Sequence, residues 1–143
     1  MFSAENMALL AEEVCGCRAE VLSGGLGGDN AATVIAHLWG RQPVLIPYDE
    51  DYNHEPCQRS GHRAHWAVAS GVLLGLAPGS HFLSFGSTAV REVFVLAKQG
   101  KSLRYQLWSL DSVAQSNEQL RTMGPQRAQD GTLEDSDLLR ASQ

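Results

Sequence analysis

Two short apolar runs separated by a long polar loop limit the folds open to this chain. The first run, Pro43 to Tyr48, has a continuous Val-Leu-Ile core, which predicts a strand buried on both faces. The polar loop Asp49 to His62 follows, and the second run, Trp66 to Val68, lies in a long predicted strand from His65 to Leu76. Because a strand fixes its backbone, we expect His65 to be held rigidly at the edge of a sheet.

The remaining sequence patterns predict an α+β fold, in which helices accompany an antiparallel sheet. A first helix is expected between Ser3, as its N-cap, and Gly16, as its stop. The residues of this helix that are expected to face the core are Met7, Leu10, Ala11 and Val14. The other predicted elements are helices from Asp29 or Asn30 to Gly40 and from Asp111 or Ser112 to Leu120, and strands at 18–22, 92–98 and 103–110.

A domain boundary is predicted near residue 123. Residues 1–123 carry the patterns of helices and strands and are interpreted as a partial domain. Residues 124–143 lose apolar content and gather acidic side chains, which predicts a polar, disordered tail. Since the chain opens directly in a predicted helix and its end lacks a strand signal, we interpret it as a piece of something larger.

Charge and composition argue against several classes of protein. The formal net charge of −5 disfavours general nucleic-acid binding, which depends on clustered Lys and Arg. No basic segment followed by an apolar core indicates a signal peptide, and the longest apolar run is too short to span a bilayer as a helix. Cys15 and Cys17 are too close in sequence for an ordinary disulfide, so reduced thiols in the cytosol are the simpler interpretation.

Five segments together resemble one known family. They are residues 22–28 (LSGGLGG), 45–59 (LIPYDEDYNHEPCQR), 61–68 (GHRAHWAV), 98–102 (KQGKS) and 105–108 (YQLW). The family that they resemble is the actin maturation proteases of animals, and the long loop motif is specific enough to make chance an unsatisfactory explanation. The resemblance implies a papain-like fold, similar to that of the peptidases that process bacteriocin leaders.

The same resemblance implies an activity and partners. Family members are cytoplasmic cysteine aminopeptidases that remove the acetylated first residue, Met or Cys, from actin, where acidic residues follow it. A proline-rich region is implied to bind profilin, and a helix that opens with Gln-Cys-Gly supplies the nucleophile. This sequence contains neither feature. The chain therefore resembles an incomplete or alternatively spliced product that lacks the nucleophile helix, and we expect it to be inactive or nearly so on its own.

His65 is the residue to which the resemblance assigns the role of general base. Its neutral imidazole would take the thiol proton and later protonate the leaving amine. Asp111 and Ser109 are the candidates for the third residue that orients the imidazole. Asp111 has the better chemistry, since a carboxylate stabilises imidazolium, whereas Ser109 has the better alignment with the family pattern. The alternative for His65 is a histidine at a strand edge without a reactive role.

Arg59, Arg63 and Trp66 are the candidate substrate-binding residues. The two arginines flank the site in sequence and would attract an acidic peptide such as the actin N-terminus, although solvated loop charges are an equal alternative.

Two further motifs were weighed as ligand sites. Zinc could use a set of side chains in the polar loop, namely His54, Cys57, His62 and His65. Their spacing is not that of a standard zinc finger, so no metal site is predicted. The glycine-rich loop Ser23 to Gly28 lacks the Lys-Ser/Thr ending of a P-loop, so a tight connection is predicted and no cofactor.

The sequence thus predicts an actin maturation protease-like domain. Two alternatives remain open. One is a non-catalytic actin- or partner-binding module, and the other is an unstable fragment with exposed apolar surface.

Overall fold

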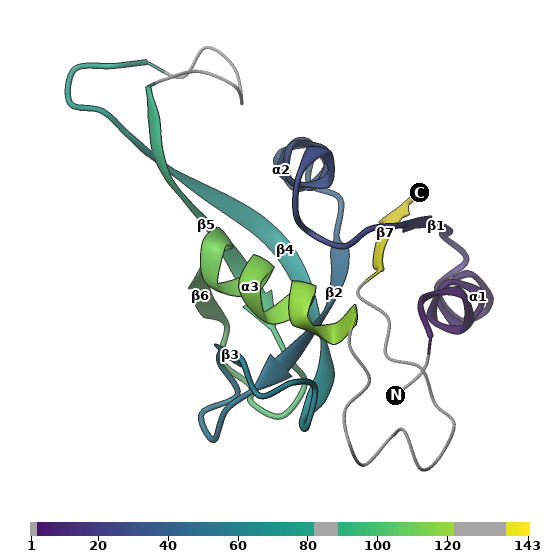
Figure 1. Ribbon diagram of the computed structural model, residues 1–143. Helices are drawn as coiled ribbons and strands as arrows, with labels where there is room; N and C mark the ends of the chain where they lie inside the picture. Colours follow the sequence, from purple (N-terminus) through teal and green to yellow (C-terminus); the bar gives the residue numbers. More distant parts are fainter. Residues whose placement is uncertain (1–2, 82–88, 122–136) are drawn as a thin grey trace.

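Strands from all parts of the sequence combine into one antiparallel sheet in this computed structural model, which describes residues 3–81, 89–121 and 137–143 (Figure 1). Within these ranges the strand order is β1-β7-β2-β4-β5-β6, and the short β3 pairs with one end of β2. The strands are β1 (Arg18–Leu22), β2 (Val44–Glu50), β3 (Pro56–Cys57), β4 (Ala64–Leu76), β5 (Val90–Lys98), β6 (Gln106–Ser109) and β7 (Leu138–Ser142). The helices are α1 (Ala4–Cys15), α2 (Asp29–Trp39) and α3 (Leu110–Glu118), with a short 3-10 turn at Gln119–Arg121. The predicted α+β class is confirmed.

The two apolar runs identified in the sequence form the centre of the sheet. β2 is buried along nearly its whole length, as its continuous apolar core predicts, and it pairs with β4 in an antiparallel register. His65 is the second residue of β4 and lies opposite Tyr48. Since directly opposite residues of an antiparallel pair project to the same side, the imidazole shares a face with the Tyr48 ring.

The helix ends follow local signals, with one correction. The Ser3 hydroxyl accepts a hydrogen bond from the Asn6 N–H (3.2 Å), and Gly16 closes α1 in the left-handed conformation at φ +63°, as predicted. The prediction that Asp29 or Asn30 caps α2 is wrong, because Gly28 occupies the cap position. The Asn30 amide instead donates to the carbonyls of Ser23 and Gly25, both at 2.8 Å, and so closes the glycine-rich loop.

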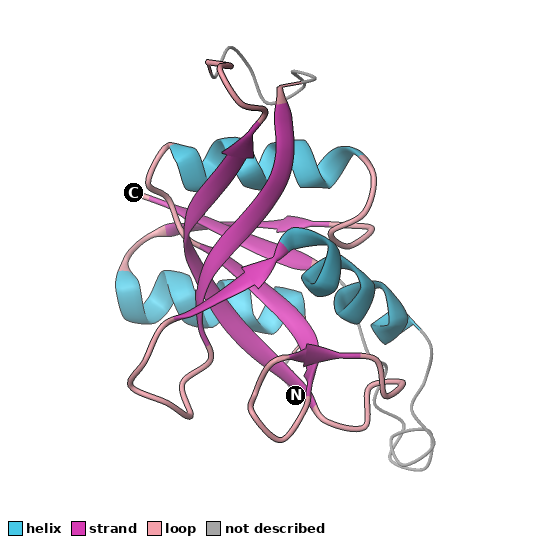
Figure 2. Ribbon diagram, turned by 90° about the vertical axis from the view of Figure 1, so that its left-hand side faces the viewer, coloured by secondary structure: helices cyan, strands magenta, loops and turns pink. Residues whose placement is uncertain are grey.

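One face of the sheet is covered by α2 and α3 and contains the core (Figures 1 and 2). Alternate residues of the central strands project to this face, where Val34 and Leu38 of α2 and Val113 of α3 pack on them. The buried strand residues of this covered face are Val44, Ile46, Tyr48, Ala67, Ala69, Val95, Ala97 and Trp108.

Among the residues that the structure describes, the opposite face of the sheet is covered only at one end, where α1 packs against β1 and β7 (Figure 1). Leu10 and Val14 were predicted to face the core from α1, but they are 43% and 71% exposed. They line an open groove of about 940 Å³ between α1 and the sheet, together with Leu45 and Val68. The apolar stripe of α1 therefore faces this groove instead of a closed core.

The predicted disordered tail is wrong for its last segment. Residues 138–142 form β7, which lies between β1 and β2, with Leu138 and Leu139 fully buried. The window is only five residues long and carries no clear strand period, and the burial comes from pairing with strands that are remote in sequence. Residues 122–136 of that tail lie outside the described residues, so the boundary near residue 123 stays a prediction. None of the helices in the described ranges has the length and apolar character needed to cross a bilayer.

Candidate active site

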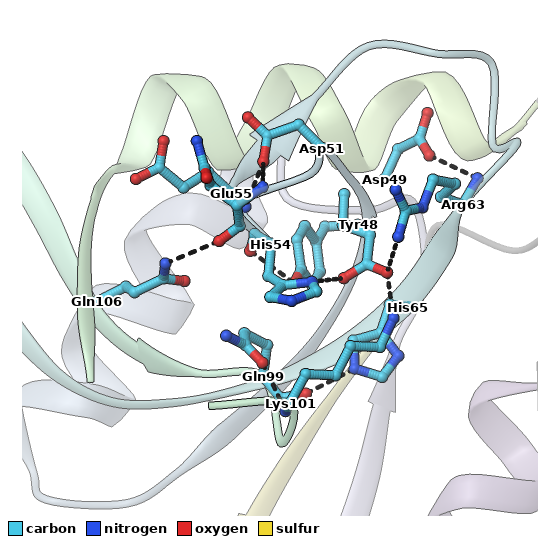
Figure 3. A network of polar contacts seen from close by, with 12 residues as sticks. Tyr48, Asp49, Asp51, His54, Glu55, Arg63, His65, Gln99, Lys101 and Gln106 are labelled. Atoms are coloured by element: carbon cyan, nitrogen blue, oxygen red, sulfur yellow. Dashed lines mark hydrogen bonds and ion pairs between the residues drawn. The ribbon is translucent and has the colours of Figure 1, made fainter. Parts of the chain in front are cut away.

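His65 lies half-buried at the end of the covered face, and its ring is tied to the neighbouring turn (Figure 3). Its Nε2 atom is 2.6 Å from the backbone carbonyl oxygen of Gln99, directly after β5. A carbonyl oxygen only accepts hydrogen bonds, so Nε2 carries the hydrogen in this contact. In the neutral ring the lone pair is therefore on Nδ1, which is the nitrogen that could accept a proton.

The turn that holds His65 is itself tightly organised. Gln99 is only 2% exposed, and its side-chain Oε1 accepts a hydrogen bond from the Lys101 backbone N–H at 2.6 Å. Gly100 adopts φ +83° between them, a conformation that side chains rarely tolerate. These contacts fix where the Gln99 carbonyl points, which is toward the imidazole.

A buried carboxylate, Glu50, connects this turn to the polar loop (Figure 3). Glu50 is 2% exposed, and its oxygens accept hydrogen bonds from Lys101 Nζ, His54 Nδ1 (3.0 Å) and Arg63 Nη2 (3.5 Å). Burial alone would raise the pKa of this carboxyl group. The hydrogen bonds from Lys101 and His54, with the charges of Lys101 and His65, outweigh burial and lower the Glu50 pKa. Glu50 is therefore a carboxylate with cationic groups on several sides.

Asp49 organises the loop that precedes His65. Its fully buried carboxylate accepts hydrogen bonds from the backbone N–H groups of Arg59 (2.7 Å), Gly61 (3.1 Å) and Arg63 (2.9 Å). In this loop Ser60 and Gly61 both have positive φ, at +55° and +75°. The carboxylate thus stabilises a turn with an uncommon backbone conformation and fixes the entry into β4.

Two buried polar residues of α3 fix the same end of β2. The Ser116 hydroxyl accepts from the Asp49 N–H (2.8 Å) and donates to the Asp49 carbonyl (3.0 Å). The Asn117 amide donates to the Pro47 carbonyl (2.9 Å) and accepts from the Leu26 N–H (2.8 Å). These bonds satisfy the backbone of β2 on the side away from β4, where the short β3 is the strand that pairs with this end of β2 within the described residues.

Tyr48 lies beside the imidazole on the same face of the sheet. Its hydroxyl donates to the His54 carbonyl (2.9 Å), and its ring packs on Trp108 at 4.9 Å and lies 6.2 Å from the His65 ring. Burial, followed by the negative charges of Glu50 and Asp51, raises the Tyr48 pKa above its ordinary value. Tyr48 is therefore a neutral structural support and a poor proton donor to solvent.

Ser109 and Asp111 do not lie beside His65. Ser109 pairs with Phe94 of β5, and Phe94 pairs with Leu73 of β4. Leu73 is eight residues along β4 from His65, which corresponds to roughly 25 Å at 3.3 Å per residue. The Ser109 hydroxyl caps α3 by accepting from the Ser112 N–H (3.1 Å), and Asp111 is exposed in the first turn of that helix. The expectation that either residue orients His65 is wrong, since Gln99 occupies that position.

The three predicted substrate-binding residues are only partly brought together. The guanidinium groups of Arg59 and Arg63 lie over the Tyr52 ring, at 5.0 and 5.5 Å from its centre, and Arg63 also contacts Glu50. Trp66 follows His65 directly in β4, so its side chain projects to the opposite face of the sheet. The arginines therefore border the site, and Trp66 does not share its face.

The three cysteines of the chain are placed away from His65. Cys15 and Cys17 line the groove beside α1, on the opposite face of the sheet. Cys57 pairs with Asp49 on the far side of β2 from β4. Burial, followed by the charge of Asp49, raises the Cys57 pKa, which disfavours the reactive thiolate.

The histidines considered as zinc ligands make other contacts in the structure. His54 contacts Glu50, the Nδ1 atom of His62 lies 2.5 Å from the Arg59 carbonyl, and His65 contacts Gln99. In the ranges that the structure describes, no group of three or more His, Cys, Asp or Glu side chains could hold a metal ion.

Sequence reasoning missed Glu50, Gln99 and Lys101 as parts of the site. A usable signal was present, because two adjacent carboxylates, Asp49 and Glu50, continue a strand that is otherwise apolar. Buried acids require partners, so this position predicts a polar cluster. The turn at 99–101 was predicted, but its proximity to His65 depends on the register between β4 and β5.

Comparison with known proteins places these features in a family. Residues 1–73 match the family described as actin maturation protease-like, C-terminal domain. A Danio rerio protein named actin maturation protease is 59% identical, over 92% of this chain and 50% of that protein. The proteins of that name from Xenopus tropicalis and Homo sapiens are 51% and 48% identical, over 93% of this chain and 49% and 44% of their own lengths.

The chain spans about half the length of the curated relatives it matches. No solved structure matches it. The family match covers just over half of the 143 residues, including the loop and the first part of β4 with His65. The chain therefore belongs to the actin maturation protease-like family.

Proposed function

We propose that this chain contributes the general-base part of a cysteine-peptidase site that removes the acetylated N-terminal Met or Cys from actin. The observation that carries the proposal is the 2.6 Å contact between His65 Nε2 and the Gln99 carbonyl, which leaves Nδ1 as the basic nitrogen. Membership of the actin maturation protease-like family supports actin as the substrate and proteolysis as the activity. A papain-like arrangement and a cytoplasmic location are part of the same proposal.

The reaction that this geometry supports is acyl transfer to a thiol, followed by hydrolysis. Nδ1 of His65 takes the thiol proton, and the thiolate attacks the carbonyl carbon of the first residue of actin. The imidazolium returns that proton to the amine nitrogen as the peptide bond breaks, which leaves a thioester. A water molecule, deprotonated by the same nitrogen, hydrolyses the thioester, releases the acetylated residue and restores the thiol. The Gln99 carbonyl keeps the ring in the required tautomer throughout.

The thiol is proposed to come from a segment other than the three cysteines described above. Cys15 and Cys17 lie on the opposite face of the sheet, and Cys57 combines an unfavourable position with a raised pKa. The relatives are about twice as long as this chain. We assign the nucleophile, and the proline-rich segment expected to bind profilin, to the part of the relatives that the chain does not span.

Arg59 and Arg63 are proposed to bind the acidic residues that follow the first residue of actin. Their guanidinium groups converge on the Tyr52 ring, which is 79% exposed, with Arg59 exposed and Arg63 half-buried beside the site. Charge reversal at both positions is expected to raise KM for an acidic peptide about tenfold or more while changing kcat little. A neutral peptide of the same length serves as the control, and an equal effect on both peptides would count against electrostatic binding.

The test is a chimera in which this chain replaces the matching half of the Danio rerio relative. Release of acetyl-Met from an acetyl-Met peptide with acidic second and third residues is followed by mass spectrometry. We expect cleavage by the chimera and a loss of about 10³-fold or more in its His65→Ala variant. The matched controls Ser109→Ala and Asp111→Asn are expected to retain activity within about threefold, because both residues lie far from the imidazole.

Two outcomes would change the proposal. Cleavage by the isolated chain that disappears in His65→Ala would assign the nucleophile to one of its own cysteines. Binding of the peptide by a folded chimera without any cleavage would favour the alternative function, a non-catalytic actin-binding module.

A further inference from the structure

We propose that Glu50 is a positioning residue for His65, acting through Lys101 and the turn that carries the Gln99 carbonyl. The catalytic meaning of this inference rests on the proposed function, whereas the structural relation does not. The chain of contacts runs from the Glu50 carboxylate to Lys101 Nζ, from the Lys101 N–H to the Gln99 side chain, and from the Gln99 carbonyl to the imidazole.

Glu50 is a buried carboxylate in a strand, so its charge requires partners. A strand residue that is 2% exposed is normally apolar, because burying a charge is costly unless it is fully paired. Here His54, Arg63 and Lys101 approach the carboxylate from two segments of the chain. His54 and Arg63 belong to the loop before β4, and only Lys101 belongs to the turn that contacts His65.

The turn connects β5 to a segment before β6 that is mostly exposed, with Leu103 at 92%. The Gln99 side chain fixes the internal shape of the turn by accepting from the Lys101 N–H. The ion pair between Lys101 and Glu50 fixes the turn relative to β2, and β2 is the strand that pairs with β4 opposite His65.

The position of the Gln99 carbonyl determines which of its two neutral tautomers His65 adopts. With the Gln99 carbonyl in place, the hydrogen resides on Nε2 and Nδ1 is free to act as a base. Without the ion pair the carbonyl is free to move, and the tautomer with hydrogen on Nδ1 becomes populated. That tautomer has no lone pair on Nδ1, so it cannot take a proton from a thiol placed on that side.

The test uses the full chain and nuclear magnetic resonance of its ring nitrogens. In ¹⁵N-labelled protein the His65 signals are assigned as those absent from His65→Gln. We expect the wild-type ring to be almost entirely in the Nε2–H form. Glu50→Gln and Lys101→Met should both shift His65 toward a mixture of tautomers, and the double variant should shift it no further than either single change.

The matched control is His54→Asn. His54 also contacts Glu50 but lies in the loop, and Asn suits its left-handed backbone at φ +65°. Its His65 tautomer should stay as in the wild type. Lys101 is 41% exposed, so Lys101→Met is expected to fold. It therefore decides the test even if Glu50→Gln fails to fold. An unchanged His65 tautomer in folded Lys101→Met would overturn the proposal.

Kinetics of the chimera separate this inference from the proposed function. Glu50→Gln should lower kcat about 10- to 100-fold with little change in KM, because a displaced base affects the chemical step. Equal kcat in Glu50→Gln and the wild-type chimera would contradict the positioning role. A chimera that never cleaves would refute the proposed function, and the tautomer measurement would still decide whether Glu50 positions the ring.

Discussion

The two faces of the central sheet differ far more in their burial than in their composition. On β5, Val95 is fully buried and its neighbour Leu96 is 37% exposed. On β6, Trp108 is 5% exposed and its neighbour Leu107 is 52% exposed. All four are apolar, so the difference comes from α2 and α3, which cover one face, and not from an alternation of apolar and polar residues.

This comparison shows that sequence period alone does not identify the inner face of such a sheet. Period-two alternation identifies the core when the outer face is polar. In this chain both faces carry Leu, Val and aromatic side chains, and the assignment depends on where the helices pack. The same sheet therefore offers pairs of adjacent residues of similar size and different burial, which allow matched mutational tests.

The largest expected effect is truncation on the covered face. Ile46→Ala should lower the free energy of unfolding by about 3 kcal/mol, because Ile46 is 1% exposed and its loss leaves a cavity. Leu45→Ala, the adjacent change on the other face, should cost roughly half as much, since Leu45 borders an open groove. Urea denaturation of both variants measures the difference. Equal losses would mean that the two faces are equally packed.

A second pair of variants compares two positions on the opposite face of the sheet, one under α1 and one away from it. Leu139 of β7 is fully buried at the end where α1 packs, whereas Leu107 of β6 lies on the part that no described helix covers. Leu139→Ala should cost about 2–3 kcal/mol and Leu107→Ala about 0.5 kcal/mol or less. Thermal unfolding followed by circular dichroism distinguishes them. A small effect at Leu139 would show that β7 contributes little to the sheet.

A smaller effect is expected at the polar end of the covered face. Glu50→Gln should lower the free energy of unfolding at pH 7 by about 1–2 kcal/mol, a value reduced because Lys101 and Arg63 are partly exposed. The Glu50 pKa is lowered in the folded state, so its stabilising contribution is present above the ordinary value of 4.5 and is lost as pH falls below it.

Denaturation at several pH values checks this sign. The wild-type protein should lose stability through the acid range more steeply than Glu50→Gln, so the two curves should approach each other at low pH. The control is Glu20→Gln, which breaks an ion pair with Arg140 in which Glu20 is 60% exposed. Its effect at pH 7 should be within about 0.5 kcal/mol. Parallel pH curves for Glu50→Gln and the wild type would contradict the lowered pKa.

Local signals account for the parts of the fold that the sequence predicted correctly. Ser3 and Gly16 define α1 through a cap and a left-handed stop, and the Val-Leu-Ile run defines β2 because burial on both faces needs a continuous apolar stretch. His65 was placed near the start of β4 for the same reason. These signals act within a few residues, so they are visible in a single sequence.

The parts that were missed depend on contacts between remote segments. Leu138 to Ser142 is a short window after a polar stretch, and its burial comes from β1 and β2. Gln99 meets His65 only because of the register between β4 and β5, and no local pattern encodes that register. Ser109 was interpreted as a residue that orients His65, but it has a different role. The serine is the N-cap of α3.

The location of β7 also has a consequence for biosynthesis. Arg18 in β1 pairs with Ser142 in β7, so the pairing between these two strands forms only after about 120 further residues have been translated. At typical synthesis rates this delay is on the order of 10 seconds. During that interval α1 and β1 are available to chaperones and proteases, while β2, β4 and β5 can already pair. Completion of the sheet is therefore a late event, and the long-range closure of β1 onto β7 is expected to be the slow step of folding.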